Sequence, residues 1–171
     1  MEPAEWQKQA INEGQLLRGW IVNSYAQIEF FLGDLIVRSL TLPEYAKLAQ
    51  TLPHGAPGRI KRVRQILTQG GFFDKFSNEI SEIIDEFSNH HETRNLLAHG
   101  FCEFHFTKKG DFGLQFRKWH RQEGRQDALL LRTFRLRDLE AQKIELTALA
   151  QRALLLFRRI HDSLGLVVNA Q

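Results

Sequence analysis

The sequence predicts a mainly α-helical bundle that is interrupted by a small antiparallel β-sheet before its last helix. Two observations predict this fold class. Apolar residues recur with a helical period of about 3.6 over most of the chain, whereas from Phe112 to Phe116 they alternate with polar residues, as in a strand. A length of 171 residues, 43% of them hydrophobic and 25% charged, is typical of one globular domain. Residues 1–171 are therefore expected to form a single domain.

The first half of the chain is predicted to be helical. A long helix runs from Glu5 to about Leu40, and its geometry can relax locally at Gly14 and Gly19. Its apolar positions are Leu17, Trp20, Ile21, Ile28, Phe31, Leu32, Leu35 and Ile36. A short helix from Glu44 to Gln50 follows Pro43, and the turn residues from Pro53 to Gly58 then reverse the chain.

Two further helices are predicted before the sheet. The first covers Arg59 to Gln69 and stops at Gly70 and Gly71, because glycine commonly ends a helix. The second covers about Phe73 to Ala98 and ends at Gly100, with its apolar and motif positions at Ile80, Ile84, Phe87, His91 and Arg94.

The sheet is predicted as a three-stranded meander inserted at residues 101–136. Its strands contain Cys102 to Phe106, Phe112 to Arg117, and Ala128 to Phe134. The predicted turns are Lys108 to Asp111 and Gln122 to Gly124. The last helix is expected from Asp138 to about Leu164, with one apolar stripe that includes Leu139, Leu146 and Phe157.

Charge is segregated along the chain, although the formal net charge is only +3. The basic cluster formed by Arg59, Lys61, Arg62 and Arg64 is the candidate track for an RNA backbone. An acidic stretch follows from Asp74 to Glu92. A second basic stretch then contains Arg117, Lys118, Arg121, Arg125, Arg132, Arg135 and Arg137. Such segregation attracts phosphate backbones, but a solvated surface of mixed charge gives the same pattern.

Composition and motifs argue against several classes of protein. No window of about 18 residues is apolar enough to span a membrane, and the acidic N-terminus is unlike a secretory signal. The lone Cys102 cannot form an internal disulfide, which fits a reducing, cytoplasmic location. The sequence has no glycine-rich phosphate loop and no GxSxG elbow. We expect no cofactor.

The segment that distinguishes this chain from a generic bundle is Glu92 to Gly100, which reads ETRNLLAHG. Arg94 is followed directly by the polar Asn95, and His99 comes five positions after Arg94, next to the helix-ending Gly100. In these residues the chain resembles the HEPN superfamily, whose hallmark is an arginine followed after four to six residues by a histidine near a helix end. The His-x-Tyr extension of one toxin branch is absent, because Phe101 follows Gly100.

The resemblance implies an HEPN-like bundle in which the meander is an insertion, and it implies a metal-independent endoribonuclease. The products would be a 2′,3′-cyclic phosphate and a 5′-hydroxyl, and the setting a toxin–antitoxin pair or an anti-phage response. His99 would act as general base or acid, Arg94 would bind the scissile phosphate, and Asn95 would be a positioning hydrogen-bond donor. Glu92 and His91 would support the site. The implied partners are RNA, a second copy of the chain and a cognate antitoxin or regulator.

Helical geometry complicates this assignment. At about 100° per residue, Arg94 and His99 lie about 140° apart around a regular helix, whereas Glu92, Asn95 and His99 share a face. A long arginine side chain, a frayed last turn, or a second chain that completes the site would each resolve the problem. A homodimer with a shared, two-fold symmetric cleft is the preferred architecture, because one motif supplies one histidine whereas the reaction needs an acid and a base.

Each residue with a proposed functional role could instead have a purely structural role. Arg94 could be a buried or capping arginine paired with Glu29 or Asp34, His99 could cap helix carbonyls, and Asn95 could hold the helix end. A metal site at His91, Asn95 and His99 lacks a strong third ligand. The clustered Phe72, Phe73 and Phe76 suit a hydrophobic core better than a base-stacking surface. The alternative functions are a non-catalytic HEPN-like module for dimerisation or for RNA or nucleotide binding, and a helical adaptor.

Overall fold

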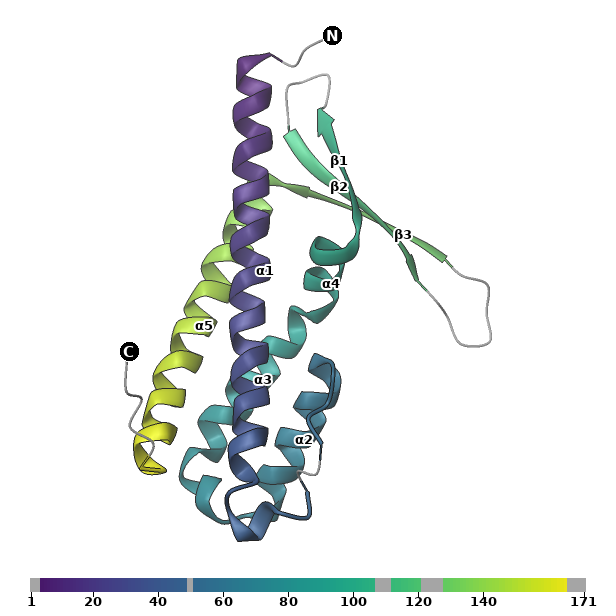
Figure 1. Cartoon of the computed structure of the whole chain (residues 1–171). Helices are drawn as coiled ribbons and strands as arrows, with labels where there is room; N and C mark the ends of the chain where they lie inside the picture. Colours follow the sequence, from purple (N-terminus) through teal and green to yellow (C-terminus); the bar gives the residue numbers. More distant parts are fainter. Residues whose placement is uncertain (1–3, 49–50, 107–111, 121–127, 166–171) are drawn as a thin grey trace. The chain divides into compact units, whose positions relative to one another are not determined.

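The computed structural model describes residues 4–48, 51–106, 112–120 and 128–165. The chain is mainly helical, and a three-stranded antiparallel sheet precedes the final helix, as predicted (Figure 1). The elements are α1 (Glu5–Ser39), η1 (Pro43–Tyr45), α2 (Ala56–Gln69), η2 (Phe72–Phe76), α3 (Ser77–Asn89), α4 (His91–His99), β1 (Phe101–Phe106), β2 (Phe112–His120), β3 (Ala128–Arg135) and α5 (Leu136–Ser163). The predicted turns at Lys108 to Asp111 and at Gln122 to Gly124 lie outside the described residues.

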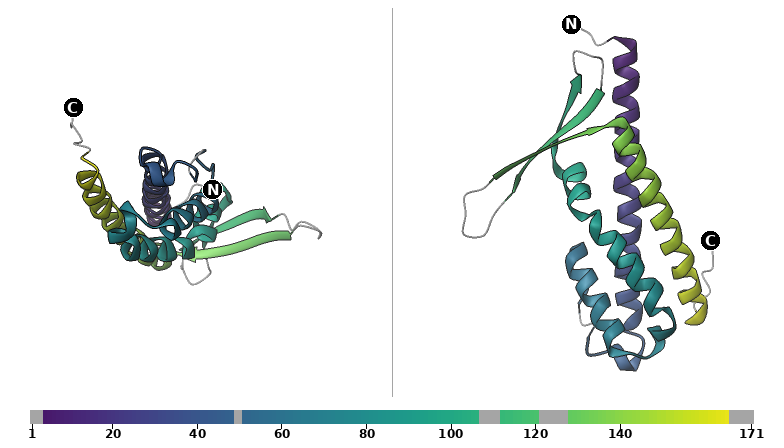
Figure 2. Two further views of the ribbon diagram at one scale, coloured as in Figure 1. Left: turned by 90° about the horizontal axis from the view of Figure 1, so that it is seen from below. Right: turned by 180° about the vertical axis from the view of Figure 1, so that it is seen from behind.

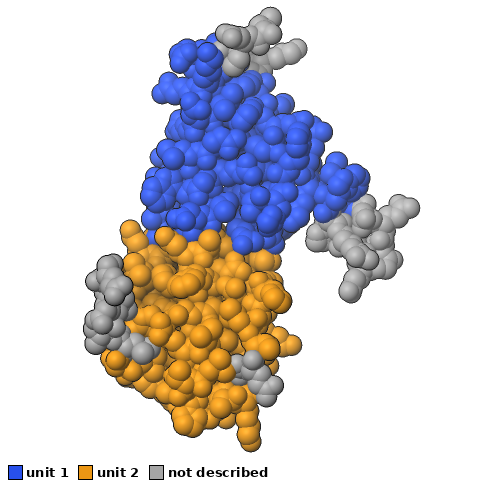
Figure 3. Space-filling view, in the orientation of Figure 1, with its two compact units in different colours: residues 1–24, 92–147 blue, residues 25–91, 148–171 orange. Residues whose placement is uncertain are grey.

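The chain divides into two compact units (Figure 3). Residues 1–24 and 92–147 form the sheet unit, which contains α4 from Glu92 onward and all three strands. Residues 25–91 and 148–171 form the helical unit, which contains α2 and α3. The helices α1 and α5 contribute residues to both units.

In the sheet unit, β2 pairs with β1 on one side and with β3 on the other, and β3 passes directly into α5 (Figure 2). One face of the sheet packs against α1. Gly14 allows this close approach, because a Cβ atom at this position would lie 2.7 Å from Cδ1 of Leu114 and the leucine side chain would have to shift. Phe116 and Phe134 are also buried on this face, with ring centroids 5.8 Å apart. The alternation in β2 thus places its apolar residues on the core face.

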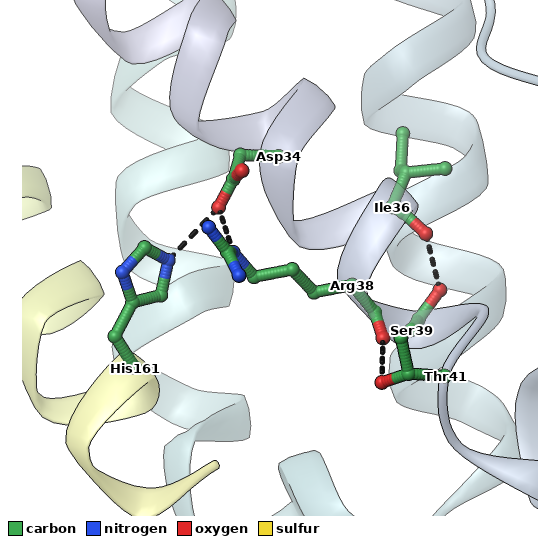
Figure 4. Close-up of polar contacts among 6 residues, drawn as sticks. All are labelled: Asp34, Ile36, Arg38, Ser39, Thr41 and His161. Atoms are coloured by element: carbon green, nitrogen blue, oxygen red, sulfur yellow. Dashed lines mark hydrogen bonds and ion pairs between the residues drawn. The ribbon is translucent and has the colours of Figure 1, made fainter. Parts of the chain in front are cut away.

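In the helical unit, the apolar stripes of α1, α3 and α5 meet in one core. Its buried members include Ile28, Leu32, Leu35, Ile80, Ile84, Phe87, Ala153 and Ile160. The side chains of Phe31 and Phe157 stack with ring centroids 4.8 Å apart. Asp34 accepts hydrogen bonds from Arg38 over 2.6 Å and from His161 over 2.9 Å, which joins α1 to α5 (Figure 4). Apolar burial therefore stabilises this bundle, and a shielded polar cluster fixes the packing of the two helices.

The prediction of one helix from Phe73 to Ala98 is wrong. The chain forms η2, then α3, and breaks at His90 before α4 begins at His91. His90 has φ of −94° and ψ of −4°, and its N–H contacts the carbonyls of Phe87 and Ser88 instead of continuing the α-helical pattern. The hydroxyl of Ser88 also bonds back to the carbonyl oxygen of Ile84 over 2.7 Å, an arrangement that bends helices.

The predicted boundaries of other helices also shift. α2 begins at Ala56 rather than at Arg59, because Pro57 lies in its first turn, where a missing N–H costs no hydrogen bond. The predicted helix from Glu44 to Gln50 is only the short 3-10 helix η1 among the described residues. α5 begins at Leu136, two residues before the predicted start at Asp138.

Candidate functional site

The motif residues lie on α4, a helix of nine residues in which one face is buried. The buried positions are Thr93, Leu96 and Leu97. Arg94 and Asn95 are half-buried beside this face, whereas Glu92 and His99 are exposed. The alternative of a buried Arg94 rested on the stripe of Ile80, Ile84 and Phe87 continuing in one helix, whereas the chain breaks at His90 before α4 begins.

Arg94 and Asn95 interact directly. Nη1 of Arg94 donates a hydrogen bond to Oδ1 of Asn95 over 2.9 Å. Neighbouring side chains leave a helix about 100° apart, so this bond requires the long arginine side chain to curve around α4 toward Asn95. Asn95 and His99 share a face because they are four residues apart. The hydrogen bond therefore draws the guanidinium of Arg94 toward the face that carries His99.

Two other arginines of the sheet unit contact α4. Nε of Arg18 donates to the carbonyl oxygen of Leu97 over 2.7 Å, and the guanidinium of Arg18 lies 5.3 Å from the centre of the Phe116 ring. Nη1 of Arg132 lies 3.4 Å from the hydroxyl oxygen of Thr93. These contacts add positive charge around the helix that carries Arg94. The sequence placed Arg132 in a basic stretch but gave no sign of Arg18 or of either contact, because no local pattern indicates that α1 and β3 supply residues to α4.

The junction between α4 and β1 is tightly packed. The N–H of Gly100 donates to the carbonyl oxygen of Leu96 over 2.8 Å. A Cβ atom at Gly100 would lie 2.5 Å from that same oxygen and 3.3 Å from the ring of Phe116. Glycine is therefore required at this position, and it fixes the path of the chain between His99 and Phe101.

His91 lies in the helical unit and is held by a buried tyrosine. The hydroxyl oxygen of Tyr25 is 2.8 Å from Nδ1 of His91, and Tyr25 is fully buried. His91 also lines a pocket of about 780 Å³ together with Lys61 and Arg64 of α2. The structure thus brings together three of the residues predicted to bind RNA or to support the site. Tyr25 carried no clear signal in the sequence.

Arg59 and Arg62, the other two members of the basic cluster, do not line this pocket. Arg59 donates to the carbonyl oxygens of Pro53 over 3.1 Å and of Glu29 over 2.9 Å, so it holds the chain before α2 against α1. Arg62 is half-buried and is not among the residues that line the pocket. Arg64 forms an exposed ion pair with Asp85 over 2.7 Å.

The other residues considered for a functional role in the sequence have structural roles or unsuitable chemistry. Phe73 and Phe76 are buried in the helical unit, as their clustering suggested. Asp34, one proposed partner of Arg94, binds Arg38 and His161. Burial raises the pKa of the Cys102 thiol, which makes it a poor nucleophile at neutral pH.

Within the described parts of the chain, no three His, Cys, Asp or Glu side chains are arranged to hold a metal ion. None of the described helices is long and apolar enough to cross a bilayer. No protein-family model matches the sequence, and neither the curated proteins nor the solved structures give a significant match.

Proposed function

We propose that the protein is a metal-independent endoribonuclease of the HEPN type, with Arg94 and His99 as its catalytic residues. The observation that carries the proposal is the hydrogen bond from Arg94 to Asn95, because it holds a guanidinium toward the helix face of the exposed His99. Arginine binds phosphate oxygens with two parallel hydrogen bonds, and imidazole transfers protons near neutral pH. These are the groups that RNA cleavage without a metal requires.

In the proposed reaction an imidazole takes the proton of a ribose 2′-hydroxyl. The 2′ oxygen attacks the adjacent phosphorus, the bond from phosphorus to the 5′ oxygen breaks, and an acid protonates the departing oxygen. The products are a 2′,3′-cyclic phosphate and a 5′-hydroxyl. The Arg94 guanidinium stabilises the negative charge that grows on the non-bridging oxygens. Asn95 positions Arg94 by accepting its hydrogen bond, whereas the sequence led us to expect a hydrogen-bond donor at this position.

We further propose that the active form is a homodimer. Because α4 remains helical as far as His99, the backbone directions of Arg94 and His99 differ by about 140° within one chain. Each α4 contributes one His99, and the reaction needs both an acid and a base. Two α4 helices that meet at their C-terminal ends would supply two histidines and two arginines to one cleft. A cognate antitoxin or regulator would then act by covering this cleft.

The test is cleavage of a mixed single-stranded RNA in excess EDTA by the wild type and by Arg94→Ala and His99→Ala. Arg158→Ala and His54→Ala are matched controls, since both residues are exposed and belong to the helical unit, whereas Arg94 and His99 belong to the sheet unit. We expect cyclic-phosphate products from the wild type and both controls. Each motif variant should lose activity by about 100-fold or more while remaining folded. Equal cleavage by all five proteins would refute the assignment.

The same helical geometry favours a second candidate, a non-catalytic module that binds RNA. An α4 in which Arg94 and His99 diverge within one chain binds phosphate through Arg94 without bringing His99 to the same phosphorus. A folded wild type that binds RNA and releases no cyclic phosphate would select this candidate. Its binding should weaken with added salt, because phosphate contacts release counterions.

A further inference from the structure

The side of α2 that carries Lys61 and Arg64 borders the pocket of about 780 Å³, and all of its described lining residues belong to the helical unit. Its lining residues on α2 include a set that recurs every three or four positions and therefore shares one side of the helix: Pro57, Lys61, Arg64 and Thr68. Ser88 of α3 and His91 at the start of α4 also line it. Pockets that bind small molecules commonly have volumes of about 300–1,000 Å³, so a small ligand fits this one.

Part of the pocket wall is apolar. Leu48, Pro57 and Ile60 line it, and both Leu48 and Ile60 are only half-buried, so apolar surface remains in contact with water. A ligand that covers these side chains gains the free energy of burying apolar surface. An ion that is polar on all sides, such as inorganic phosphate, would leave this part of the wall without an apolar partner. The pocket therefore suits a ligand with an apolar body.

The permanently charged side chains of the pocket are cations. Lys61 and Arg64 line it three positions apart, and no aspartate or glutamate is among its described lining residues. Arg64 pairs with Asp85 over 2.7 Å, but both side chains of this pair are more than half exposed, and Asp85 does not line the pocket. Such an exposed pair is weak, and a guanidinium has five N–H donors, so Arg64 can bind a second anion. The charge of the wall therefore favours an anionic ligand.

Buried contacts hold part of the wall in one orientation. The hydroxyl oxygen of Tyr25, which is fully buried, lies 2.8 Å from Nδ1 of His91. The hydroxyl of Ser88 donates to the carbonyl oxygen of Ile84 over 2.7 Å. Side chains that are already held in place lose little conformational entropy when a ligand binds. This wall is therefore organised before a ligand arrives.

We propose that the pocket binds a small organic anion, a carboxylate or a phosphate ester, whose apolar body covers Leu48, Pro57 and Ile60. Its charged head contacts Lys61 and Arg64. This inference goes beyond the proposed function, because it concerns the helical unit and needs no RNA cleavage. It also assigns Lys61 and Arg64 a ligand other than the RNA backbone expected from the sequence. An RNA backbone bound through its phosphates would use the two cations and leave the apolar wall uncovered.

The experiment compares two fluorescent probes on the full chain. Anilinonaphthalene sulfonate has an apolar body and an anionic sulfonate, which stands in for the head of the ligand, whereas N-phenylnaphthylamine has the same rings without the sulfonate. Fluorescence titration gives the Kd of each probe. Lys61→Gln and Arg64→Gln should each weaken binding of the anionic probe by about tenfold and leave the Kd of the neutral probe within about twofold. Ile60→Ala should weaken both probes.

Gln65→Glu is the sharpest variant, because it adds a carboxylate to an exposed position of the pocket wall and keeps the shape of the side chain. Repulsion should weaken binding of the anionic probe by about fivefold or more and leave the Kd of the neutral probe within about twofold. Gln151→Glu is the matched control, since Gln151 is an exposed glutamine of α5 in the same unit and does not line the pocket. It should leave both Kd values within about twofold of the wild type.

Competition against the bound anionic probe identifies the head group. Displacement at a lower concentration of octanoate supports a carboxylate, and displacement at a lower concentration of phenyl phosphate supports a phosphate ester. The proposal is overturned if neither displaces the probe, if Lys61→Gln, Arg64→Gln and Gln65→Glu all bind it as tightly as the wild type, or if Gln65→Glu weakens both probes equally. It is also overturned if a mixed single-stranded RNA displaces the probe and neither small anion does, which would return the two cations to RNA binding.

Discussion

Nη1 of Arg94 donates a hydrogen bond to Oδ1 of Asn95, its immediate neighbour on α4, over 2.9 Å. Adjacent residues of a helix do not normally face one another, so this contact restricts a long and otherwise adaptable side chain. In the proposed function, Asn95 holds the guanidinium toward the face of His99 through this hydrogen bond.

Replacing Asn95 tests this positioning role. Leucine has a similar shape but cannot accept a hydrogen bond, so Asn95→Leu should release the guanidinium. Hydrogen bonds to charged groups contribute about 1.5–3 kcal/mol, which predicts a fall in kcat of about 10- to 100-fold. The rate constant of single-turnover cleavage in excess EDTA measures this fall. Full kcat in Asn95→Leu together with inactivity in Arg94→Ala would show that Arg94 needs no positioning.

Arg18 connects α1 to the last turn of α4. Its Nε donates to the carbonyl oxygen of Leu97, and its guanidinium lies over the ring of Phe116. Arg18→Met retains the apolar stem but leaves this carbonyl without its donor, so the free energy of unfolding should fall by about 1–3 kcal/mol. Urea denaturation measures the loss. The exposed Arg158→Met should change stability by less than about 0.5 kcal/mol, and a similar loss there would contradict a specific role for Arg18.

The two glycines Gly100 and Gly19 should respond to alanine in opposite directions. A Cβ atom at Gly100 meets the backbone oxygen of Leu96 at 2.5 Å, so Gly100→Ala forces the junction between α4 and β1 to shift. We expect a loss of about 1–3 kcal/mol. Nothing lies within 4 Å of a Cβ atom at Gly19, and Gly19→Ala should stabilise α1 by up to about 1 kcal/mol. Thermal unfolding of both variants checks the sign of each change.

The ion pair between Glu86 and Arg152 joins α3 to α5 and should make stability depend on pH. The hydrogen bond from Arg152 lowers the pKa of Glu86. A carboxylate with a lowered pKa in the folded state stabilises above its unfolded value of about 4.3, and this contribution disappears as the pH falls through the folded pKa. Because the pair is half exposed, we expect Glu86→Gln to cost only about 0.2–1 kcal/mol at pH 7.

Denaturant titrations at pH 7 and at about pH 3 should show that this difference between Glu86→Gln and the wild type shrinks toward zero in acid. Glu145→Gln removes an exposed carboxylate elsewhere on α5 and is the matched control. A difference that grows in acid would reverse the sign expected from the lowered pKa. It would mean that the Glu86 carboxylate destabilises the fold.

Local patterns in the sequence determined the kinds of elements and most of their positions. A helical apolar period predicted α1 from Glu5, and the structure ends it at Ser39, one residue before the predicted end. The alternation of Phe112, Leu114 and Phe116 predicted β2, because one sheet face is buried and the other is not. The candidate residues Arg94, Asn95 and His99 could also be chosen from residue type and spacing, since these properties are local.

Tertiary packing decided the rest. The break at His90 depends on how the backbone of α3 ends, and an uninterrupted apolar pattern did not reveal it. The contacts of Arg18 with Leu97 and of Tyr25 with His91 join residues 79 and 66 positions apart, so no local spacing encodes them. The exposure of Phe101 and Trp119 likewise depends on which sheet face α1 covers. The sequence shows that apolar and polar residues alternate along the strands. Only the packing of the folded chain determines which face of the sheet lies against the core.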